Sequence, residues 1–257
     1  MNSQDLFNVK GIGRMIAEGF FNAGARVYIS GREAKACEAF AAELAASPAA
    51  AKHGGSAVAL PANLQSLDEC KRLVAAVAER EPRGLHVLVN NAGATWGEGI
   101  ETYPDAAWHK LMTLNVTRVF SLTQLCIPLL EAAATAEDPA RVVHIGSIDG
   151  LRTPPMETYA YSASKAALHH LSRGLARHLG PRNITSNVIA CGPFRSKMMR
   201  ATLEKTEHVL NAEVPLRRIG TPEDVAGTCI YLASRAGAFC NGALIRLDGG
   251  TSLVSKI

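Results

Sequence analysis

A tyrosine and a lysine lie four residues apart in a helical pattern, at Tyr161 and Lys165. This spacing places both side chains on one face of a helix, about one turn apart. A nearby ammonium favours the phenolate and lowers the tyrosine pKa, so that the phenol becomes a usable proton donor to a carbonyl near neutral pH. Taken alone, the same spacing also fits a surface helix with no chemical role.

Three further groups of polar or small residues accompany this pair. Ser147 directly follows an expected strand, Val142 to Gly146, where its hydroxyl would hold a substrate oxygen beside Tyr161. Asn90, Asn91, Ala92 and Gly93 follow another strand, and small residues there let a ribose and a ring approach the backbone. Asn115 interrupts an apolar helical pattern, and by itself it is more typical of a core amide than of a catalytic group.

The elements that would position these residues alternate between strand and helix, which is typical of βαβ crossovers and a parallel sheet. We expect strands at Arg26 to Ser30, Ser56 to Leu60, His86 to Asn90, Val142 to Gly146, Ser186 to Ala190 and Leu244 to Leu247. We expect helices at Ile12 to Asn22, Glu33 to Ala46, Leu67 to Arg80, Ala106 to Ala134, Thr158 to Leu179 and Pro222 to Ser234. The alanine-rich stretch Ala41 to Ala51 is expected to end a helix and continue as a surface loop.

The strands are short and almost continuously apolar, as in Val87-Leu88-Val89, which indicates a sheet covered by helices on both faces. The fold class is therefore α/β, with a doubly wound parallel sheet of the Rossmann type. A chain of 257 residues with 47% hydrophobic residues is long enough for one large domain, 1–257. In such sheets ligands bind beyond the carboxyl ends of the strands, where Ser147 and the Asn90 to Gly93 segment lie.

The bulk composition excludes several other classes of protein. The net charge of +4 is spread along the chain, which argues against nucleic-acid or membrane-surface partners. Six cysteines lack any Cys-x-x-Cys or Cys/His spacing, so we expect no disulfide framework and no metal. No segment reads as a signal peptide or a membrane span, which predicts a soluble cytoplasmic protein. A peroxisomal location stays open, because Ser255-Lys256-Ile257 differs from the Ser-Lys-Leu address at one residue.

The ordered set of motifs from about Gly11 to Gly250 resembles the short-chain dehydrogenase/reductase family. Within that family, the sequence motifs most resemble the branch of 3-oxoacyl reductases of the rhamnolipid-pathway type and related fungal proteins. The resemblance rests on Asn90-Asn91-Ala92-Gly93, Asn115, Ser147, Tyr161 to Lys165, Asn187 with Gly192, Pro215 to Asp224, and Asp248-Gly249-Gly250.

The resemblance implies a role for each residue of the catalytic set. Tyr161 would exchange a proton with the substrate oxygen while Ser147 orients that oxygen. Lys165 would bind the nicotinamide ribose and depress the pKa of Tyr161, and Asn115 would support a water chain that returns the proton. Cofactor contacts would come from Asn90, Ala92, Gly93 and Gly192, together with Gly11, Ile12 and Gly13.

The choice of nicotinamide cofactor depends on the end of the strand Arg26 to Ser30. No Asp or Glu closes this strand, as would be needed to bind the adenosine ribose of NAD. Arg32 follows instead, and its guanidinium suits a 2′-phosphate, so NADP is favoured; a solvated arginine at the start of a helix is the alternative. Asn63 stands where the family often has an Asp beside adenine.

The first βα unit departs from the family pattern. Of the usual Thr-Gly-x-x-x-Gly-Ile-Gly turn only Gly11-Ile12-Gly13 remains. If Leu6 to Lys10 form the turn, Met1 to Asp5 make a poor strand; if Leu6 to Val9 form the strand, the turn is several residues short. About eleven residues are missing relative to the family. We therefore expect a truncated first unit, unpaired neighbouring strands and weakened cofactor binding.

Two other segments differ from the family or concern the substrate. Cys191 precedes Gly192 where the family usually has Pro, and it is interpreted as packing and not as a nucleophile. Phe194 to Glu213 matches a substrate-covering loop, with Met198 and Met199 as an apolar wall and Arg195, Lys197 and Arg200 as possible contacts for an anionic acyl thioester.

Two hypotheses of function follow. The first is an NADP-dependent enzyme that reduces a ketone or 3-oxoacyl group to the secondary alcohol, or the reverse. The alternative is a silent or cofactor-impaired relative that acts as a partner subunit or regulator. By resemblance, we also expect a homodimer or homotetramer formed through the long helices Ala106 to Ala134 and Thr158 to Leu179.

Overall fold

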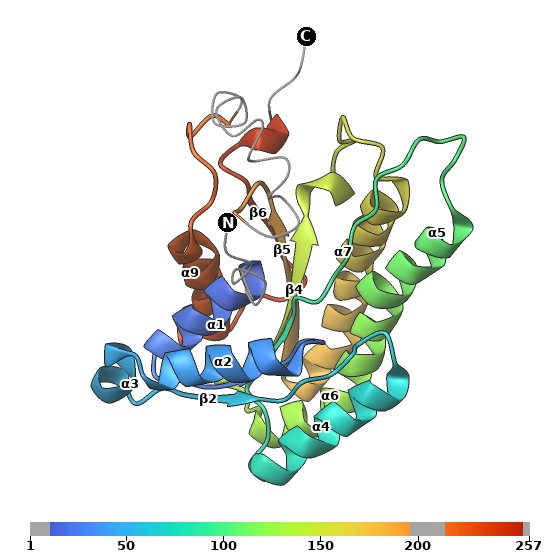
Figure 1. Ribbon diagram of the computed structural model, residues 1–257. Helices are drawn as coiled ribbons and strands as arrows, with labels where there is room; N and C mark the ends of the chain where they lie inside the picture. The colour runs from blue at the N-terminus through green and yellow to red at the C-terminus, as the bar shows by residue number, and fades with distance from the viewer. Residues whose placement is uncertain (1–10, 196–213, 254–257) are drawn as a thin grey trace.

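The computed structural model describes residues 11–195 and 214–253, in which strands and helices alternate (Figure 1). The strands are β1 (Arg26–Ile29), β2 (Ser56–Ala59), β3 (Val87–Asn90), β4 (Ala140–Ser147), β5 (Ile184–Cys191) and β6 (Leu244–Leu247). The helices are α1 (Ile12–Asn22), α2 (Ala34–Ala45), α3 (Pro48–His53), α4 (Leu67–Arg80), α5 (Asp105–Met112), α6 (Arg118–Ala133), α7 (Tyr159–Leu179) and α9 (Pro222–Ala233). This arrangement confirms the α/β class.

The parallel strands form two separate sheets. One has the order β1-β2 and the other the order β3-β4-β5-β6. In a doubly wound sheet of strand order 3-2-1-4-5-6, the first strand lies in the centre, next to the strands that here are β1 and β3. No strand of the described residues takes that central place. The described strands thus divide into two sheets at this place, while the expected truncation of the first βα unit concerns residues 1–10, outside the described residues, and stays a prediction.

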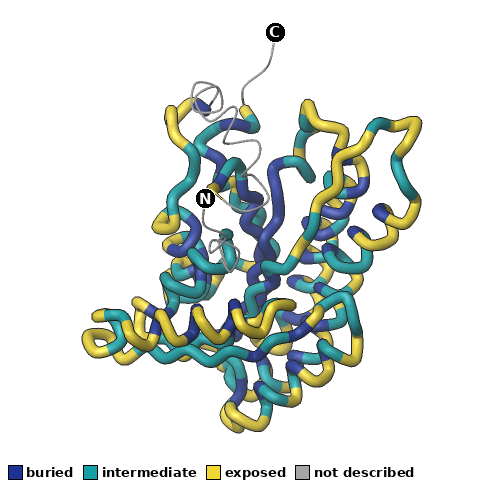
Figure 2. The backbone as a smooth tube through the Cα atoms, in the orientation of Figure 1, coloured by how far each residue is buried: buried dark blue, intermediate teal, exposed yellow. Residues whose placement is uncertain are grey.

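The strands differ in how deeply they are buried. Every residue of β4 and β5 is buried, whereas β2 is half-buried throughout and β3 is half-buried up to Val89 (Figure 2). Strands covered on both faces and paired on both edges have near-continuous apolar runs, and the polar residues in these two strands, such as His144 and Asn187, are hydrogen-bonded. The pairing of β4 with β5 runs from Ala140 with Ile184 to Ser147 with Cys191. The two strands thus end at the same level and present Ser147 and Cys191 side by side.

Helices cover both faces of the sheets. On one face α1 and α9 pack on Val143, Ile145 and Ile189, and α2 packs with Phe21 of α1 on Ile29. On the other face α4, α6 and α7 form a cluster with Val142 and Ile184. These helices hold the carboxyl ends of β3, β4 and β5 in fixed positions relative to α7.

The helix expected over Ala106 to Ala134 is interrupted. A π-helical turn, Thr113–Thr117, separates α5 from α6, and Pro128 lies inside α6. Such turns insert one residue into the hydrogen-bond ladder and often occur at functional sites. The stretch expected as a loop after Ala46 contains the short helix α3, with Ser47 before it and Pro48 at its first position.

The stretch Asp105–Ala133 is the one described helix long and apolar enough, by length and composition, to cross a membrane. The core helix of a soluble protein meets the same criterion, so this is weak evidence for a membrane segment. In this fold Leu122, Cys126 and Leu130 belong to the core cluster beneath β4.

Candidate active site

Ser147 and Tyr161 meet at the carboxyl end of β4. Ser147 is the last residue of that strand, one place earlier than the sequence predicts, and its Oγ accepts a hydrogen bond of 3.1 Å from the Asp149 amide. Tyr161 lies in the first turn of α7, and its phenol contacts the Ser147 hydroxyl. The pair is therefore assembled from a strand end and a helix start that are distant in the sequence.

The pKa of Tyr161 differs from the expected direction. Burial raises the pKa of the phenol to about 12, while hydrogen bonding from Ser147 lowers it and the nearby Asp149 and Cys191 raise it. We expected Lys165 to depress this pKa, whereas burial raises it and Lys165 is not among the groups that lower it. The physical reason is that the desolvation of the phenolate outweighs the local favourable contacts.

Lys165 is buried on the same face of α7. Its Nζ donates a hydrogen bond of 2.8 Å to the Ile145 carbonyl and lies 5.7 Å from the centre of the Tyr161 ring. Burial lowers the pKa of the ammonium to about 8. A Cβ on Gly93 would lie 3.6 Å from this Nζ, so the absence of a side chain at Gly93 leaves the space beside the ammonium open.

Asn115 lies fully buried in the π-helical turn. Its Nδ2 donates to the Ala94 carbonyl and to Ser164 Oγ, and its Oδ1 accepts from the Ala94 amide, each at 3.0 Å. Asn115 thereby fastens the segment after β3 to α7, one residue before Lys165. Its side-chain hydrogen bonds are made within the protein, as expected for a core amide.

A second buried polar chain begins at Asn90. Its Nδ2 lies 3.1 Å from Thr123 Oγ1 and 3.3 Å from His144 Nδ1, and His144 Nε2 lies 3.1 Å from Ser186 Oγ. An amide NH2 only donates, so His144 Nδ1 accepts and its proton resides on Nε2. Burial, and then the Lys165 charge, lower the pKa of His144 to about 3. His144 is therefore a neutral, buried side chain that links Asn90 to Ser186 by hydrogen bonds.

The expected adenosine-end residues lie at the start of α1 and beyond the carboxyl ends of β1 and β2, in the two-stranded sheet. Gly11 precedes α1, Ile12 opens it, and a Cβ on Gly13 would meet the Asn91 amide at 2.4 Å. Arg32, beyond β1, is exposed and makes no ion pair with any residue in the described ranges. Asn63, beyond β2, is exposed, and its Oδ1 accepts from the Gln65 amide at 3.2 Å.

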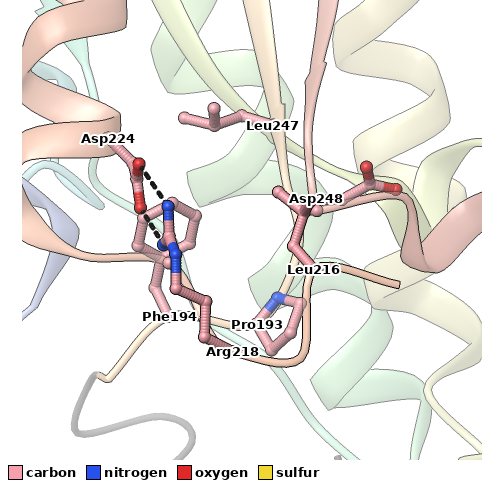
Figure 3. A pocket seen from close by; sticks show the side chains of 9 residues that line it. Pro193, Phe194, Leu216, Arg218, Asp224, Leu247 and Asp248 are labelled. Carbon is pink, nitrogen blue, oxygen red and sulfur yellow. Dashed lines mark hydrogen bonds and ion pairs between the residues drawn. The ribbon is translucent and has the colours of Figure 1, made fainter. Parts of the chain in front are cut away.

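A small hollow lies beyond the carboxyl ends of β5 and β6 (Figure 3). Phe194, Leu216 and Leu247 wall it, and Arg218 lies across it, bonded to Asp224 at 2.5 and 3.0 Å. Gly192 borders this region, because a Cβ there would lie 2.6 Å from that of Asp248. The hollow adjoins the site without containing Ser147 or Tyr161.

The structure unites most of the predicted site. The side chains that come together at the end of β4 are those of Ser147, Tyr161, Lys165 and Asn115, next to the segment with Asn90, Ala92 and Gly93. Other predicted positions lie outside the described residues, namely Lys197, Met198, Met199, Arg200 and Ser255 to Ile257. Sequence reasoning missed Asp149, whose pKa is raised by burial. The rule that chemistry follows strand ends was the available signal for it. Burial raises the pKa of the Cys191 thiol to about 12, which is consistent with packing and not with a nucleophile.

Comparisons with known proteins agree with this geometry. The model of a family described as Enoyl-(Acyl carrier protein) reductase matches residues 6–252. A rhamnolipids biosynthesis 3-oxoacyl-[acyl-carrier-protein] reductase from Pseudomonas aeruginosa is 46% identical over 95% of this chain and 93% of its own length. A galactitol 2-dehydrogenase (L-tagatose-forming) from Cereibacter sphaeroides is 32% identical over 93% of this chain and 90% of its own.

The fold is also similar to solved structures. The Pseudomonas aeruginosa RhlG/NADP active-site complex superposes with a TM-score of 0.87 at 45% identity, covering 95% of this chain and 93% of that one. A short-chain dehydrogenase/reductase from Brucella melitensis gives a TM-score of 0.83 at 28% identity, covering 94% of this chain and 92% of that one.

Proposed function

This chain belongs to the short-chain dehydrogenase/reductase family, and we propose that it is an NADP-dependent enzyme that reduces a ketone or 3-oxoacyl group to the secondary alcohol, or catalyses the reverse. The observation that carries the proposal is the convergence of the Ser147 hydroxyl, the Tyr161 phenol and the Lys165 ammonium at one sheet edge. A hydrogen-bond donor, a proton donor and a cation in one place match the demands of carbonyl reduction.

The residues present fit NADP at two of its parts. Gly93 leaves room beside Lys165 for a ribose, and Arg32 presents an exposed guanidinium for a 2′-phosphate. Between these ends, the amides of the first turn of α1, which have no partner within a helix, would contact the pyrophosphate. Of the glycine-rich turn that normally supports this contact, the sequence keeps only Gly11-Ile12-Gly13, so we expect weak cofactor affinity.

The proposed mechanism assigns one task to each residue. The bound cofactor would supply or accept the hydride. Tyr161, protonated at neutral pH, donates its proton to the substrate oxygen, which Ser147 orients by a hydrogen bond. Lys165 binds the ribose hydroxyls and stabilises the phenolate that forms at Tyr161. Asn115 acts as a positioning residue, because its hydrogen bonds hold Ala94 and the helix that carries Lys165.

The finer substrate proposal is a 3-oxoacyl thioester, supported by the name of the relative that is 46% identical. The test is oxidation of NADPH by the full chain with a short 3-oxoacyl coenzyme A thioester. Tyr161→Phe should lower kcat by about 10²–10⁴-fold, as expected for the loss of a proton donor. Tyr159→Phe is the matched control, because Tyr159 is exposed and, among the described residues, its hydroxyl donates a hydrogen bond only to Glu157. Equal losses in both variants, or no NADPH binding, would contradict the proposal.

We also propose that the enzyme is a homodimer paired through α6 and α7. An apolar groove runs between these helices, lined by Phe120, Gln124, Ile127, His170, Leu171, Gly174, Leu175, His178 and Leu179. Gly174→Glu should yield monomers in sedimentation velocity experiments. Gly227→Glu is the control, since a Cβ at either glycine meets open space. A dimer that persists in Gly174→Glu would refute this pairing.

A further inference from the structure

Exposed aromatic side chains gather in the segment between β3 and α5 and in α5 itself. Trp96 is 40% exposed and Trp108 is 39% exposed, although a tryptophan usually buries most of its large surface. Tyr103 contacts both residues: its hydroxyl donates a hydrogen bond of 3.4 Å to the Trp96 carbonyl, and its ring meets that of Trp108 edge-on at 6.3 Å. We call Trp96, Tyr103 and Trp108 the aromatic shelf. Exposed apolar side chains that cluster in this way commonly mark a binding surface.

The aromatic shelf adjoins the catalytic tyrosine. Tyr103 and Tyr161 pack against one buried cluster, whose members are Ala107, Leu111 and Ala160. At the other end of the shelf, Trp96 follows Ala94 by two residues, and Asn115 holds the backbone of Ala94 by two hydrogen bonds of 3.0 Å. The shelf is thus fixed at both ends to the catalytic set. A substrate whose carbonyl reaches Tyr161 has the shelf within reach of the rest of its chain.

The turn before α7 supports the aromatic shelf. The Glu98 amide donates a hydrogen bond of 3.2 Å to the Glu157 carbonyl, so the segment between β3 and α5 lies beside this turn (Figure 1). The Tyr159 ring meets that of Tyr103 edge-on at 5.6 Å, a contact that Tyr159→Phe keeps. Edge-to-face contacts between rings favour a defined orientation of each ring. The shelf therefore presents a fixed apolar surface beside the catalytic site.

Carboxylates border the aromatic shelf. A Cβ on Gly99 would lie 3.8 Å from Glu101 Oε2 and 3.9 Å from Glu157 Oε2, so these two groups come close together. Glu98 adds a third carboxylate, which accepts a hydrogen bond of 3.0 Å from the Thr102 hydroxyl. Like charges placed side by side are disfavoured in recognition. This border therefore discriminates against a phosphate or carboxylate group and accepts a neutral one.

We propose that the aromatic shelf binds the neutral acyl chain of a 3-oxoacyl thioester, while the anionic carrier end of the substrate points away from Glu98, Glu101 and Glu157. This inference rests on the proposed function and specifies which part of the substrate the shelf recognises. Burial of one CH2 group on an apolar surface improves a Kd by about two- to fourfold. Longer acyl chains should therefore bind progressively more tightly until they cover the shelf.

Intrinsic fluorescence reports directly on this surface, because the chain contains two tryptophans and both belong to the aromatic shelf. Trp108→Phe leaves Trp96 as the single reporter. The probes are S-(3-oxoacyl)-N-acetylcysteamine thioesters from 3-oxobutyryl to 3-oxododecanoyl, added with NADP⁺, which cannot reduce a ketone. They should shift the Trp96 emission to shorter wavelength in a saturable manner, and the Kd should fall by about two- to fourfold for each added CH2. The matching coenzyme A thioesters should show the same dependence on chain length.

A pair of variants separates the aromatic shelf from other exposed apolar side chains. Trp96→Ala should lower kcat/KM for the 3-oxododecanoyl thioester by about tenfold or more, mainly through KM, and should lower that for the 3-oxobutyryl thioester far less. Phe239→Ala is the matched control. The Phe239 ring is fully exposed, but it precedes β6 and so lies at the amino ends of the strands, away from the site. This variant should keep the chain-length dependence of the parent.

Three results would overturn the proposal. The first is a set of Kd values that do not depend on acyl chain length. The second is a Trp96 emission that follows the identity of the carrier and not the length of the acyl chain. The third is an equal effect of Trp96→Ala and Phe239→Ala. The fluorescence titration does not depend on turnover, so binding with the expected chain-length dependence but without oxidation of NADPH would contradict the proposed function and leave the shelf in place.

Discussion

Burial favours the neutral form of both Lys165 and Tyr161. The pKa of Lys165 falls to about 8 and that of Tyr161 rises to about 12, because both charged forms lose hydration. A proton can therefore remain on the phenol until a substrate and a ribose arrive. At the residue scale burial keeps Tyr161 neutral at pH 7 and brings Lys165 close to deprotonation just above it, so a ligand must supply the interactions that stabilise a phenolate.

The depressed pKa of Lys165 predicts a pH dependence of stability. Between the folded pKa of about 8 and the ordinary value of 10.5, the unfolded chain binds the proton that the folded chain has lost. The free energy of unfolding should therefore gain about 2 kcal/mol from this group as pH rises from 8 to 10. Urea titrations of the chain and of Lys165→Met check this, since only the parent should show the gain.

Lys35→Met, a substitution of an exposed lysine, is the control and should follow the parent. The window must stop near pH 10, because the raised pKa of Tyr161 reverses the sign above that value: there the unfolded tyrosine ionises and the folded one does not. Parallel curves for the parent and Lys165→Met would show that Lys165 is charged in the folded chain throughout.

Arg32 gives a second prediction at this scale. Arg32→Ala should raise the Kd for NADPH by about tenfold or more and leave that for NADH nearly unchanged, because the guanidinium matches a phosphate that only NADPH carries. Isothermal titration of both cofactors measures the two constants. Lys35→Ala is the control: Lys35 is another exposed cation shortly after Arg32 in the sequence, and its loss should alter neither dissociation constant. An equal rise in Kd for both cofactors would instead indicate a general defect in binding the adenosine part of the cofactor.

At the scale of elements, the π-helical turn Thr113–Thr117 is the feature that joins three parts of the site. It turns Asn115 inward, so that one amide holds the segment after β3 and the first turns of α7. The periodicity of the sequence predicts one continuous helix here. A single inserted residue in the ladder leaves the apolar period almost intact, so the interruption has no clear sequence signal.

Asn115→Ala should destabilise the fold by about 2–4 kcal/mol, because it removes three hydrogen bonds, two of them to the half-buried backbone of Ala94 and one to the buried Ser164 hydroxyl. Chemical denaturation provides the measurement. Thr117→Ala, in the same turn but exposed, should change the stability little. If the two substitutions had equal effects on stability, Asn115 would not hold the segment after β3 to α7 as we infer.

Local patterns were sufficient for most elements and for the catalytic set. Caps and apolar periods predict α1 and α4 with their observed bounds, and strand ends locate Ser147 and Asn90. The pKa of Tyr161 was not predictable in the same way, because it depends on how deeply the packed fold buries the phenol. Helix α3 was missed, since six residues carry too little periodic signal.

At the scale of the whole molecule, two sheets share one set of helices. The β1-β2 sheet is fastened at one end by Glu81, whose carboxylate accepts from the Tyr28 hydroxyl at 2.8 Å and from Arg26 at 3.2 Å. Glu81 follows α4, so this contact connects the small sheet to the helical layer beneath the larger one. The sequence predicts a truncated first unit, and the paired registers show how the described strands divide into two sheets.

Glu81→Ala should loosen the small sheet selectively. Native-state hydrogen exchange should show faster opening at Val27 and Ile29, by about 1 kcal/mol in the free energy of opening, while amides of β5 keep their rates. Glu79→Ala is the control, because Glu79 is highly exposed and contacts only Arg80 as an ion pair. Uniform acceleration across both sheets would mean that the molecule opens as one unit.

Within residues 11–195 and 214–253, one edge of β3 has no strand partner, and this bears on how the sheet avoids association with other chains. Natural proteins usually protect such an edge with charges, bulges or a covering element. Val87 and Val89, on the edge of β3, carry no charge that would discourage pairing. Protection of this edge therefore depends on backbone pairing and on the covering helices, and not on side-chain charge.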